Sequence, residues 1–119
     1  VDAISGHLTA TGADPKELAS WSAALGRGPG DFPPITSTKS LIGHALGAAG
    51  AIEAVAAVLM LNGGFVHASR NCEDVHPEIA PFAASIPHET RELPGLSVMM
   101  KAGFGFGDVN AALVLRNWR

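Results

Sequence analysis

The sequence is poor in cysteine and in basic residues, and both shortages exclude classes of protein. Its single cysteine, Cys72, excludes an internal disulfide framework and fits a reducing compartment such as the cytoplasm. Eight Lys and Arg residues stand against eleven Asp and Glu, for a net charge of −3, and they form no basic stripe that would neutralise phosphates. We therefore expect a cytoplasmic protein with no nucleic-acid partner.

Charged residues of both signs are also scarce. They make up 16% of the 119 residues, whereas 47% are hydrophobic, and an ordinary soluble domain has roughly 25% charged residues. The length suits one domain with its own core, and residues 1–119 show no internal boundary or repeat. No signal peptide is visible and the chain opens on Val1 rather than Met, so we expect a fragment of a larger enzyme that buries apolar surface against another part.

Strand and helix signals alternate along the chain, which predicts an α/β fold. Asp14 is a candidate helix cap, with Pro15 at the first helical position and Glu17 three residues after the cap, and Gly26 stops the helix. We expect strands at 1–5, 34–38, 96–100 and 111–115, helices at 14–25 and 45–61, a glycine-rich loop at 103–110, and loop with short elements at 65–94.

The predicted helix at residues 45–61 has no polar face and only one charged side chain, Glu53. A helix that is apolar all round is buried on all sides, and one sheet covers only one of them. This predicts a helix between the sheet of this chain and a second layer supplied from elsewhere. A membrane span is the alternative, but the segment is shorter than roughly 20 residues and carries a carboxylate at its centre, so we expect no membrane span.

Four ionisable side chains stand near this helix or at the mouths of other elements: His7, Lys39, His44 and Glu53. A carboxylate among apolar residues is costly unless it is paired or protonated, and Lys39 is the nearest cation upstream of Glu53. A wet edge near the helix start is an equally good interpretation of Glu53. Two neutral imidazoles that face one carbonyl oxygen polarise it. Singly each histidine is more often structural, but the four together indicate a site.

The remaining histidines and Cys72 give no such signal. His67, His76 and His88 show no metal-ligand spacing with each other or with Cys72, so we expect surface histidines and no metal. Cys72 precedes two acidic residues, which disfavour a thiolate and make it a poor nucleophile. The glycines of segment 43–50 do not match the dinucleotide-binding fingerprint.

Three motifs span nearly the whole chain: His7-Leu8-Thr9-Ala10-Thr11 with Asp14 and Glu17, K-x-x-x-G-H-x-x-G-A-A-G-x-x-E over residues 39–53, and Phe104-Gly105-Phe106-Gly107 with Asn110. In this order they resemble the C-terminal part of a β-ketoacyl-acyl carrier protein synthase, a 3-oxoacyl-ACP synthase of the thiolase-like superfamily. The resemblance implies the C-terminal half of a thiolase-like fold, which is layered αβαβα in the complete enzyme, with a mixed sheet and a buried central helix.

The resemblance also implies roles for the four ionisable residues. His7 and His44 match the two catalytic histidines, which bind the malonyl thioester carbonyl and stabilise the enolate formed on decarboxylation. Lys39 matches the active-site lysine of the family. Glu53 matches the buried glutamate that helps to organise that network.

Three further positions match residues that handle the substrate. Thr9 and Thr11 match hydroxyl groups that hydrogen-bond the pantetheine arm of the carrier protein. Phe106 matches the gating phenylalanine, whose backbone N–H contributes to the oxyanion hole for the acyl-enzyme thioester.

The implied activity is an acyltransferase reaction, a decarboxylative Claisen condensation of malonyl-ACP with an acyl group in fatty acid or polyketide elongation. The cysteine that holds this acyl group lies in the N-terminal half of the family, and Cys72 does not match it. The implied partners are that N-terminal half, acyl carrier protein and a second synthase subunit in a dimer. No cofactor is implied, because the phosphopantetheine of the carrier protein carries the substrates.

The chain departs from the family pattern at Leu8, which replaces a glycine, at Lys101-Ala102-Gly103, which replaces Ser-Asn-Ser, and at Asp108, which replaces a glycine. These departures concern acyl-chain preference rather than the reaction. Two other interpretations stay open. One is a non-elongating partner subunit similar to chain-length factors, and the other is a lobe that serves only folding and association.

Overall fold

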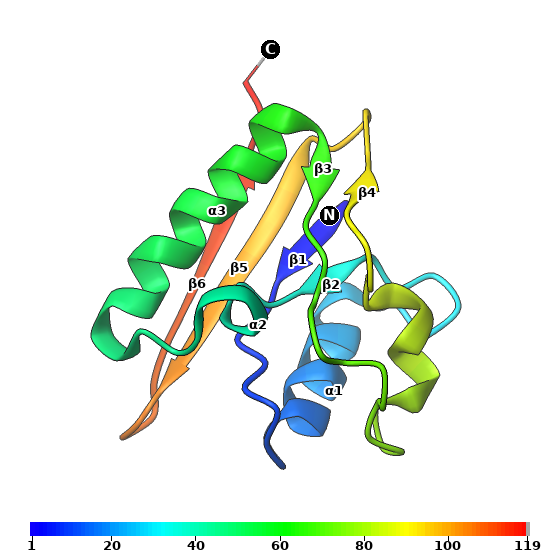
Figure 1. Cartoon of the computed structure of the whole chain (residues 1–119), viewed down its shortest axis with the longest axis vertical. Coiled ribbons are helices and arrows are strands. Elements are labelled where there is room, and N and C mark those ends of the chain that lie inside the picture. Colours follow the sequence, from blue (N-terminus) through cyan, green and yellow to red (C-terminus); the bar gives the residue numbers. More distant parts are fainter. Residues whose placement is uncertain (119) are drawn as a thin grey trace.

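A computed structural model describes residues 1–118 and shows a four-stranded mixed sheet with the strand order β2-β1-β5-β6 (Figure 1). Strand β1 pairs in parallel with both β2 and β5, and β5 pairs with β6 in antiparallel. The strands are β1 Ala3–Ser5, β2 Ile35–Thr36, β5 Val98–Gly105 and β6 Val109–Arg116. The carboxyl ends of β1, β2 and β5 therefore lie at one edge of the sheet.

Two helices, α1 (Asp14–Leu25) and α3 (Ala49–Gly63), cover opposite faces of this sheet. Successive strand residues point to opposite faces. Ala3 accordingly packs in one buried cluster with Met60 of α3, and Ile4 packs in another with Leu18 of α1. The α/β class and the mixed sheet predicted from the sequence are confirmed.

Helix α1 begins at Asp14 and ends where predicted, at Gly26, whose φ is 62°. The prediction that Asp14 caps this helix is wrong, because the N-cap residue is Ala13 and no side chain caps the helix. The Asp14 carboxylate instead accepts hydrogen bonds from the backbone N–H groups of Thr9 and Ala10, each at 3.0 Å. Its charge therefore orders the preceding loop rather than its own helix.

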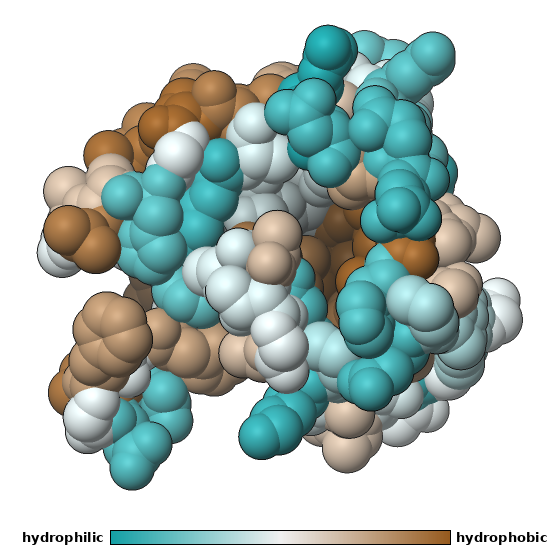
Figure 2. Space-filling model, turned by 60° about the horizontal axis from the view of Figure 1, so that its bottom comes forward, coloured by the Kyte–Doolittle hydropathy of each residue, from teal (hydrophilic) through white to brown (hydrophobic). Residues whose placement is uncertain are grey.

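Helix α3 follows a 3₁₀ turn, η1 (Leu46–Ala48), and ends at Gly64, whose φ is 67°. Within residues 1–118 it is covered on one side only. The exposed side consists of large apolar residues, and Figure 2 shows apolar side chains gathered on the side of the molecule where α3 lies. These exposed residues are Ile52, Val55, Val58 and Leu59, with Leu46 in η1. The covered side confirms half of the predicted arrangement, and the second layer stays a prediction.

The segment Leu46–Gly63 has 18 residues and a mean hydropathy of 1.6, so by length and composition alone it could cross a membrane. Core helices of soluble proteins pass the same test. Here one side of the segment packs against the sheet, and this side carries Glu53, whose residue is only 2% exposed. The packing accounts for the segment as a core helix of the α/β fold.

The other elements are short. Helix α2 (Lys39–Ile42) was not predicted, whereas β3 (Phe65–Val66), β4 (Arg91–Glu92) and the 3₁₀ helix η2 (Ala80–Ser85) are the short elements expected in 65–94. The prediction of a glycine-rich loop at 103–110 is largely wrong. Strands β5 and β6 extend into it, and only residues 106–108 form the turn, with Gly107 and Asp108 at φ 76° and 59°.

Candidate active site

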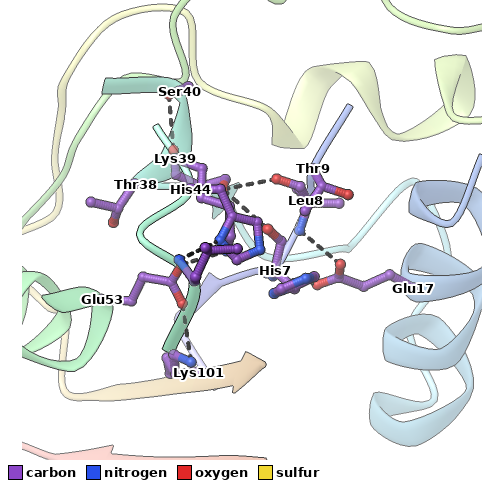
Figure 3. Close-up of polar contacts among 12 residues, drawn as sticks. His7, Leu8, Thr9, Glu17, Thr38, Lys39, Ser40, His44, Glu53 and Lys101 are labelled. Atoms are coloured by element: carbon purple, nitrogen blue, oxygen red, sulfur yellow. Dashed lines mark hydrogen bonds and ion pairs between the residues drawn. The ribbon is translucent and has the colours of Figure 1, made fainter. Parts of the chain in front are cut away.

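A polar cluster lies at the edge of the sheet where the parallel strands end (Figure 3). His7 follows β1, Lys39 opens α2 just after β2, and Lys101 lies in β5. His44 lies in the loop between α2 and η1, and Glu53 projects from α3. Ligands of open α/β sheets bind outside the carboxyl ends of the strands, so this is the position expected for a site.

The structure brings His7 and His44 together. Their ring centroids are 5.4 Å apart and the rings meet edge to face at 81°. Phe104 of β5 packs edge to face against His7 with a centroid distance of 5.8 Å. His7 is half-buried and His44 is exposed, so both rings border a surface that a substrate can reach.

The loop that carries His7 is held by Glu17 of α1. The backbone N–H groups of His7 and Leu8 donate to the two carboxylate oxygens at 2.7 and 2.8 Å, and the Trp21 indole N–H donates at 3.1 Å. Burial raises the pKa of Glu17, although these three hydrogen bonds act in the opposite direction. The backbone at His7 is thus fixed to α1 while the ring faces His44.

The surroundings of His7 favour its neutral ring, and a hydrogen bond fixes the tautomer of His44. Burial and then the charge of Lys39 lower the pKa of His7, against an opposing contribution from Glu53. The backbone N–H of Leu46 donates to Nδ1 of His44 at 3.0 Å, so a neutral His44 carries its proton on Nε2. Each ring then has an N–H group to donate to a substrate oxygen.

Glu53 binds two lysines, one at each carboxylate oxygen. Lys39 Nζ binds Oε1, and Lys101 Nζ lies 3.0 Å from Oε2 as an ion pair (Figure 3). All three side chains are buried, with exposed fractions of 7%, 6% and 3% for Lys39, Lys101 and Glu53. The interpretation of Glu53 as a wet-edge residue is therefore wrong, and the predicted pairing with Lys39 is present.

Lys101 is absent from the ionisable residues that the sequence singles out. The signal that could have found it is the period of two in β5. Lys101 is two residues from Met99, which packs on α3, and therefore points to the face that α3 and Glu53 cover. Lys101 directly follows the strand predicted at 96–100. No neighbouring residue in the sequence indicates that a carboxylate lies opposite it.

A hydrogen-bond network fixes the segment between β2 and α2. The Thr36 and Thr38 hydroxyls lie 3.1 and 3.2 Å from Nδ1 and Nε2 of His67, and the Ser37 hydroxyl donates to the Leu8 carbonyl at 3.1 Å. The prediction that His67 is a surface residue is wrong. It is half-buried, because the chain after β3 passes beside β2, whereas the other two histidines of that group, at 76 and 88, are exposed as predicted.

The residues predicted to bind substrate differ in their position and exposure. Thr9 and Thr11 lie on the His7 loop with their hydroxyl oxygens 3.0 Å apart. Phe106 stands at the tip of the β5–β6 turn and is 100% exposed. The phenylalanine that contacts His7 is Phe104, which the sequence offered only as part of the same motif.

The surroundings of Cys72 bear on its reactivity, and the described residues were also predicted to hold no metal. Burial and the neighbouring Glu73 raise the pKa of the Cys72 thiol, which donates to the Ser69 carbonyl at 3.0 Å. This agrees with a poor nucleophile. Among residues 1–118, no group of three or more His, Cys, Asp or Glu side chains is placed to hold a metal ion.

Comparisons with known proteins point to one family. The 3-oxoacyl-acyl-carrier-protein synthase 1 of Haemophilus influenzae is 40% identical over 119 residues, which cover 99% of this chain and 28% of that protein. This chain thus spans about 28% of the length of that curated relative.

Two solved structures are also similar over almost the whole chain. The ishigamide ketosynthase/chain length factor is 28% identical with a TM-score of 0.88, covering 100% of this chain and 28% of that one. The second is a structure of a type II PKS acyl-carrier protein in complex with its ketosynthase bound to the hexaketide. The matched chain is 29% identical with a TM-score of 0.81, and the match covers 99% of this chain and 28% of that one. The profile of the β-ketoacyl synthase C-terminal domain matches residues 1–73, and the chain belongs to this family.

Proposed function

We propose that the chain is the lobe of a β-ketoacyl-acyl carrier protein synthase that activates the malonyl unit for a decarboxylative Claisen condensation. The observation that carries this proposal is the pair of histidine rings, 5.4 Å apart, beside the buried ion pair of Lys39 and Glu53. Membership of the family and the name of the H. influenzae relative support the reaction class, an acyl transfer in fatty acid or polyketide elongation.

In the proposed reaction His7 and His44 act as neutral hydrogen-bond donors. Their N–H groups bind the carbonyl oxygen of the malonyl thioester. When the bond to the carboxylate carbon breaks, carbon dioxide leaves and the electron pair of that bond forms an enolate. The two donors stabilise the negative oxygen of this enolate. Donors that are already oriented contribute most of their effect at this step, because they need no rearrangement as charge develops.

The enolate carbon then attacks the acyl thioester. A carbon–carbon bond forms, the carbon–sulfur bond breaks, and the cysteine of the N-terminal half leaves as a thiolate. We assign the oxyanion of this second step to the backbone N–H of Phe106. The hydroxyls of Thr9 and Thr11 are assigned to the pantetheine arm, since both border the His7 loop.

The partners follow from what this chain leaves uncovered. We propose that the N-terminal half of the synthase covers the exposed apolar side of α3 and supplies the nucleophile, and that acyl carrier protein delivers both substrates. We also propose a dimer with a second synthase subunit, no cofactor and a cytoplasmic location. The complex of a carrier protein with its ketosynthase among the similar structures supports the second partner.

The test uses the complete synthase with His7→Ala, His44→Ala and the double variant. Malonyl-ACP decarboxylation and acyl elongation are measured separately. Loss of one oxyanion donor lowers kcat by roughly 10²- to 10³-fold, and we expect this for each single variant. His88→Ala is the matched control, because His88 is exposed and does not line the pocket that Thr11 borders. Normal turnover by the double variant contradicts the proposal.

A non-elongating subunit similar to chain-length factors is the second candidate, favoured by the ketosynthase/chain length factor among the similar structures. Such a subunit lacks the nucleophilic cysteine. Labelling the complete protein with iodoacetamide, followed by peptide mapping, separates the two. A reactive cysteine outside this chain supports the synthase, whereas its absence, together with stimulation of a separate ketosynthase, supports the second candidate.

A further inference from the structure

The ion pair between Lys101 and Glu53 gives the site a second buried ammonium group. Lys101 Nζ lies 3.0 Å from Glu53 Oε2, while Lys39 occupies Oε1. Among residues 1–118, no hydrogen-bond donor with aligned geometry reaches Oε2, so the ammonium of Lys101 is what compensates that oxygen. A carboxylate held from both oxygens cannot rotate without losing one cation.

Small residues make room for this ammonium. A Cβ atom at Gly103 would lie 2.9 Å from Lys101 Nζ, and one at Gly50 would lie 3.7 Å from it. A real Cβ does not approach another atom as closely as 2.9 Å, so a side chain at 103 would require the end of the lysine side chain to shift, whereas 3.7 Å at Gly50 is ordinary van der Waals contact. The ammonium of Lys101 therefore lies between β5 and the first turn of α3, next to two glycines.

The three buried groups carry two positive charges and one negative charge. Replacing buried ions by apolar residues of similar size is often neutral or stabilising, so stability alone does not explain a second lysine here. Burial is the largest cause that lowers the pKa of His7, followed by the charge of Lys39. Glu53 acts to raise this pKa, and His44 and then Lys101 act to lower it by smaller amounts.

We propose that Lys101 is a positioning residue of this site, which fixes the Glu53 carboxylate and so holds the Lys39 ammonium beside the two histidines. Its charge, together with those of Lys39 and His44, also acts against protonation of His7, whose neutral form donates to a carbonyl oxygen. Lys101 acts through Glu53 and does not touch substrate. This inference rests on the proposed condensation only for its kinetic readout.

The first test compares Lys101→Met, Lys101→Arg and Lys16→Met in the complete synthase. Lys16 is the matched control, because it is exposed on α1. We expect Lys101→Met to lower kcat about 10- to 100-fold through misplacement of the site. Because its ammonium no longer opposes protonation of His7, the acid limb of the pH profile should move to higher pH.

The conservative variant separates charge from packing. Lys101→Arg keeps the positive charge, so its acid limb should stay at the wild-type pH even where the bulk of the guanidinium beside Gly103 lowers the rate. A Lys101→Met variant with the wild-type pH profile overturns the proposal. Equal shifts of the acid limb in the Met and Arg variants overturn it as well, because charge would then not be the cause.

The second test is a double-mutant cycle with Glu53→Gln. If Lys101 acts through Glu53, Glu53→Gln/Lys101→Met should be at least as active and as thermostable as Glu53→Gln alone. A further loss in the double variant overturns the proposal. The cycle also decides the case in which Lys101→Met does not fold. Recovery of folding in the double variant then supports the proposal, and failure to recover overturns it.

These outcomes are distinct from failure of the proposed function. If the wild-type synthase does not condense malonyl-ACP at all, the proposed function is wrong, while the thermostability cycle still tests the link between Lys101 and Glu53. If the wild type condenses normally and the cycle shows independent effects, only the role of Lys101 is wrong.

Discussion

The two long helices cover opposite faces of the same sheet, yet their outer sides differ. The outer side of α1 carries Lys16, Ser20 and small alanines, whereas that of α3 carries Ile52, Val55, Val58 and Leu59. Val55 alone is 62% exposed. Contiguous exposed apolar surface of this kind marks an interaction site rather than a face in water.

The difference shows which face of the sheet is covered by a helix with a polar outer side. The α1 side has a polar exterior and an apolar interior, as a helix at the surface of a domain does. The α3 side buries its polar residue, Glu53, inward and leaves its apolar residues outward. The candidate active-site cluster thus lies near the side with exposed apolar residues, where the proposed N-terminal half would bring the nucleophile.

The largest expected effect is on the outer side of α3. Val55→Asp places a carboxylate where the proposed N-terminal half packs, and an unpaired buried charge costs more than about 4 kcal/mol. We expect loss of soluble, folded complete synthase, measured by size-exclusion chromatography and thermal unfolding. Ala23→Asp on the exposed side of α1 is the control and should change stability by about 0.5 kcal/mol or less. If the two variants are equally soluble and equally stable, the outer sides of both helices are exposed to water in the complete synthase.

The next effect compares the buried glutamates of the two helices. Glu53→Gln leaves two buried ammonium groups without a carboxylate and should cost about 3 to 5 kcal/mol. Glu17→Gln keeps one carbonyl acceptor but turns an amide toward backbone N–H donors, which should cost about 1 to 3 kcal/mol. Urea unfolding of the complete synthase measures both. A larger loss for Glu17→Gln contradicts the view that the lysine pair makes Glu53 indispensable.

The smallest effect compares the ends of the two helices. Gly26 and Gly64 both have positive φ, at 62° and 67°, so alanine at either should cost about 1 to 2 kcal/mol. Gly64→Ala should cost more, because its Cβ would lie 3.4 Å from the Leu93 carbonyl oxygen, whereas nothing lies within 4 Å at Gly26. Thermal unfolding measures the difference. Gly12→Ala, at an open position without positive φ, is the control; a loss there as large as at Gly26 would refute the conformational explanation.

Much of the fold could be read from local patterns. The proline of the first turn and Gly26 delimit α1, because each signal acts within one turn of its own helix. The apolar run located α3 but not its bounds, since the helix predicted at 45–61 is observed at 49–63 after a 3₁₀ turn. The glycine-rich segment was misleading, since Gly103 and Gly105 lie inside β5. Glycine marks a turn only when φ or space requires it, and in β5 the ladder with β6 holds these residues extended.

The candidate site was predictable in its residue types but not in its connections. His7, Lys39, His44 and Glu53 stand out by their setting, but nothing local shows that Glu17 binds the His7 loop instead of its own helix. The same holds for the bonds of His67, which reach hydroxyl groups about thirty residues upstream. Contacts of this range depend on how strands are ordered in the sheet, and periodicity does not encode that order.

The sequence by itself determined an α/β fold and a helix without a polar face, because period and composition are local properties. It left open whether Glu53 is paired or lies at a wet edge. Only the tertiary structure decided that Glu53 is buried and has two cations. The parallel pairing of β1 with β5 sets Lys101 beside Ser5 in register, and α3 then lies over that face. Strand order and register, which bring distant residues together, are what the folded sheet adds.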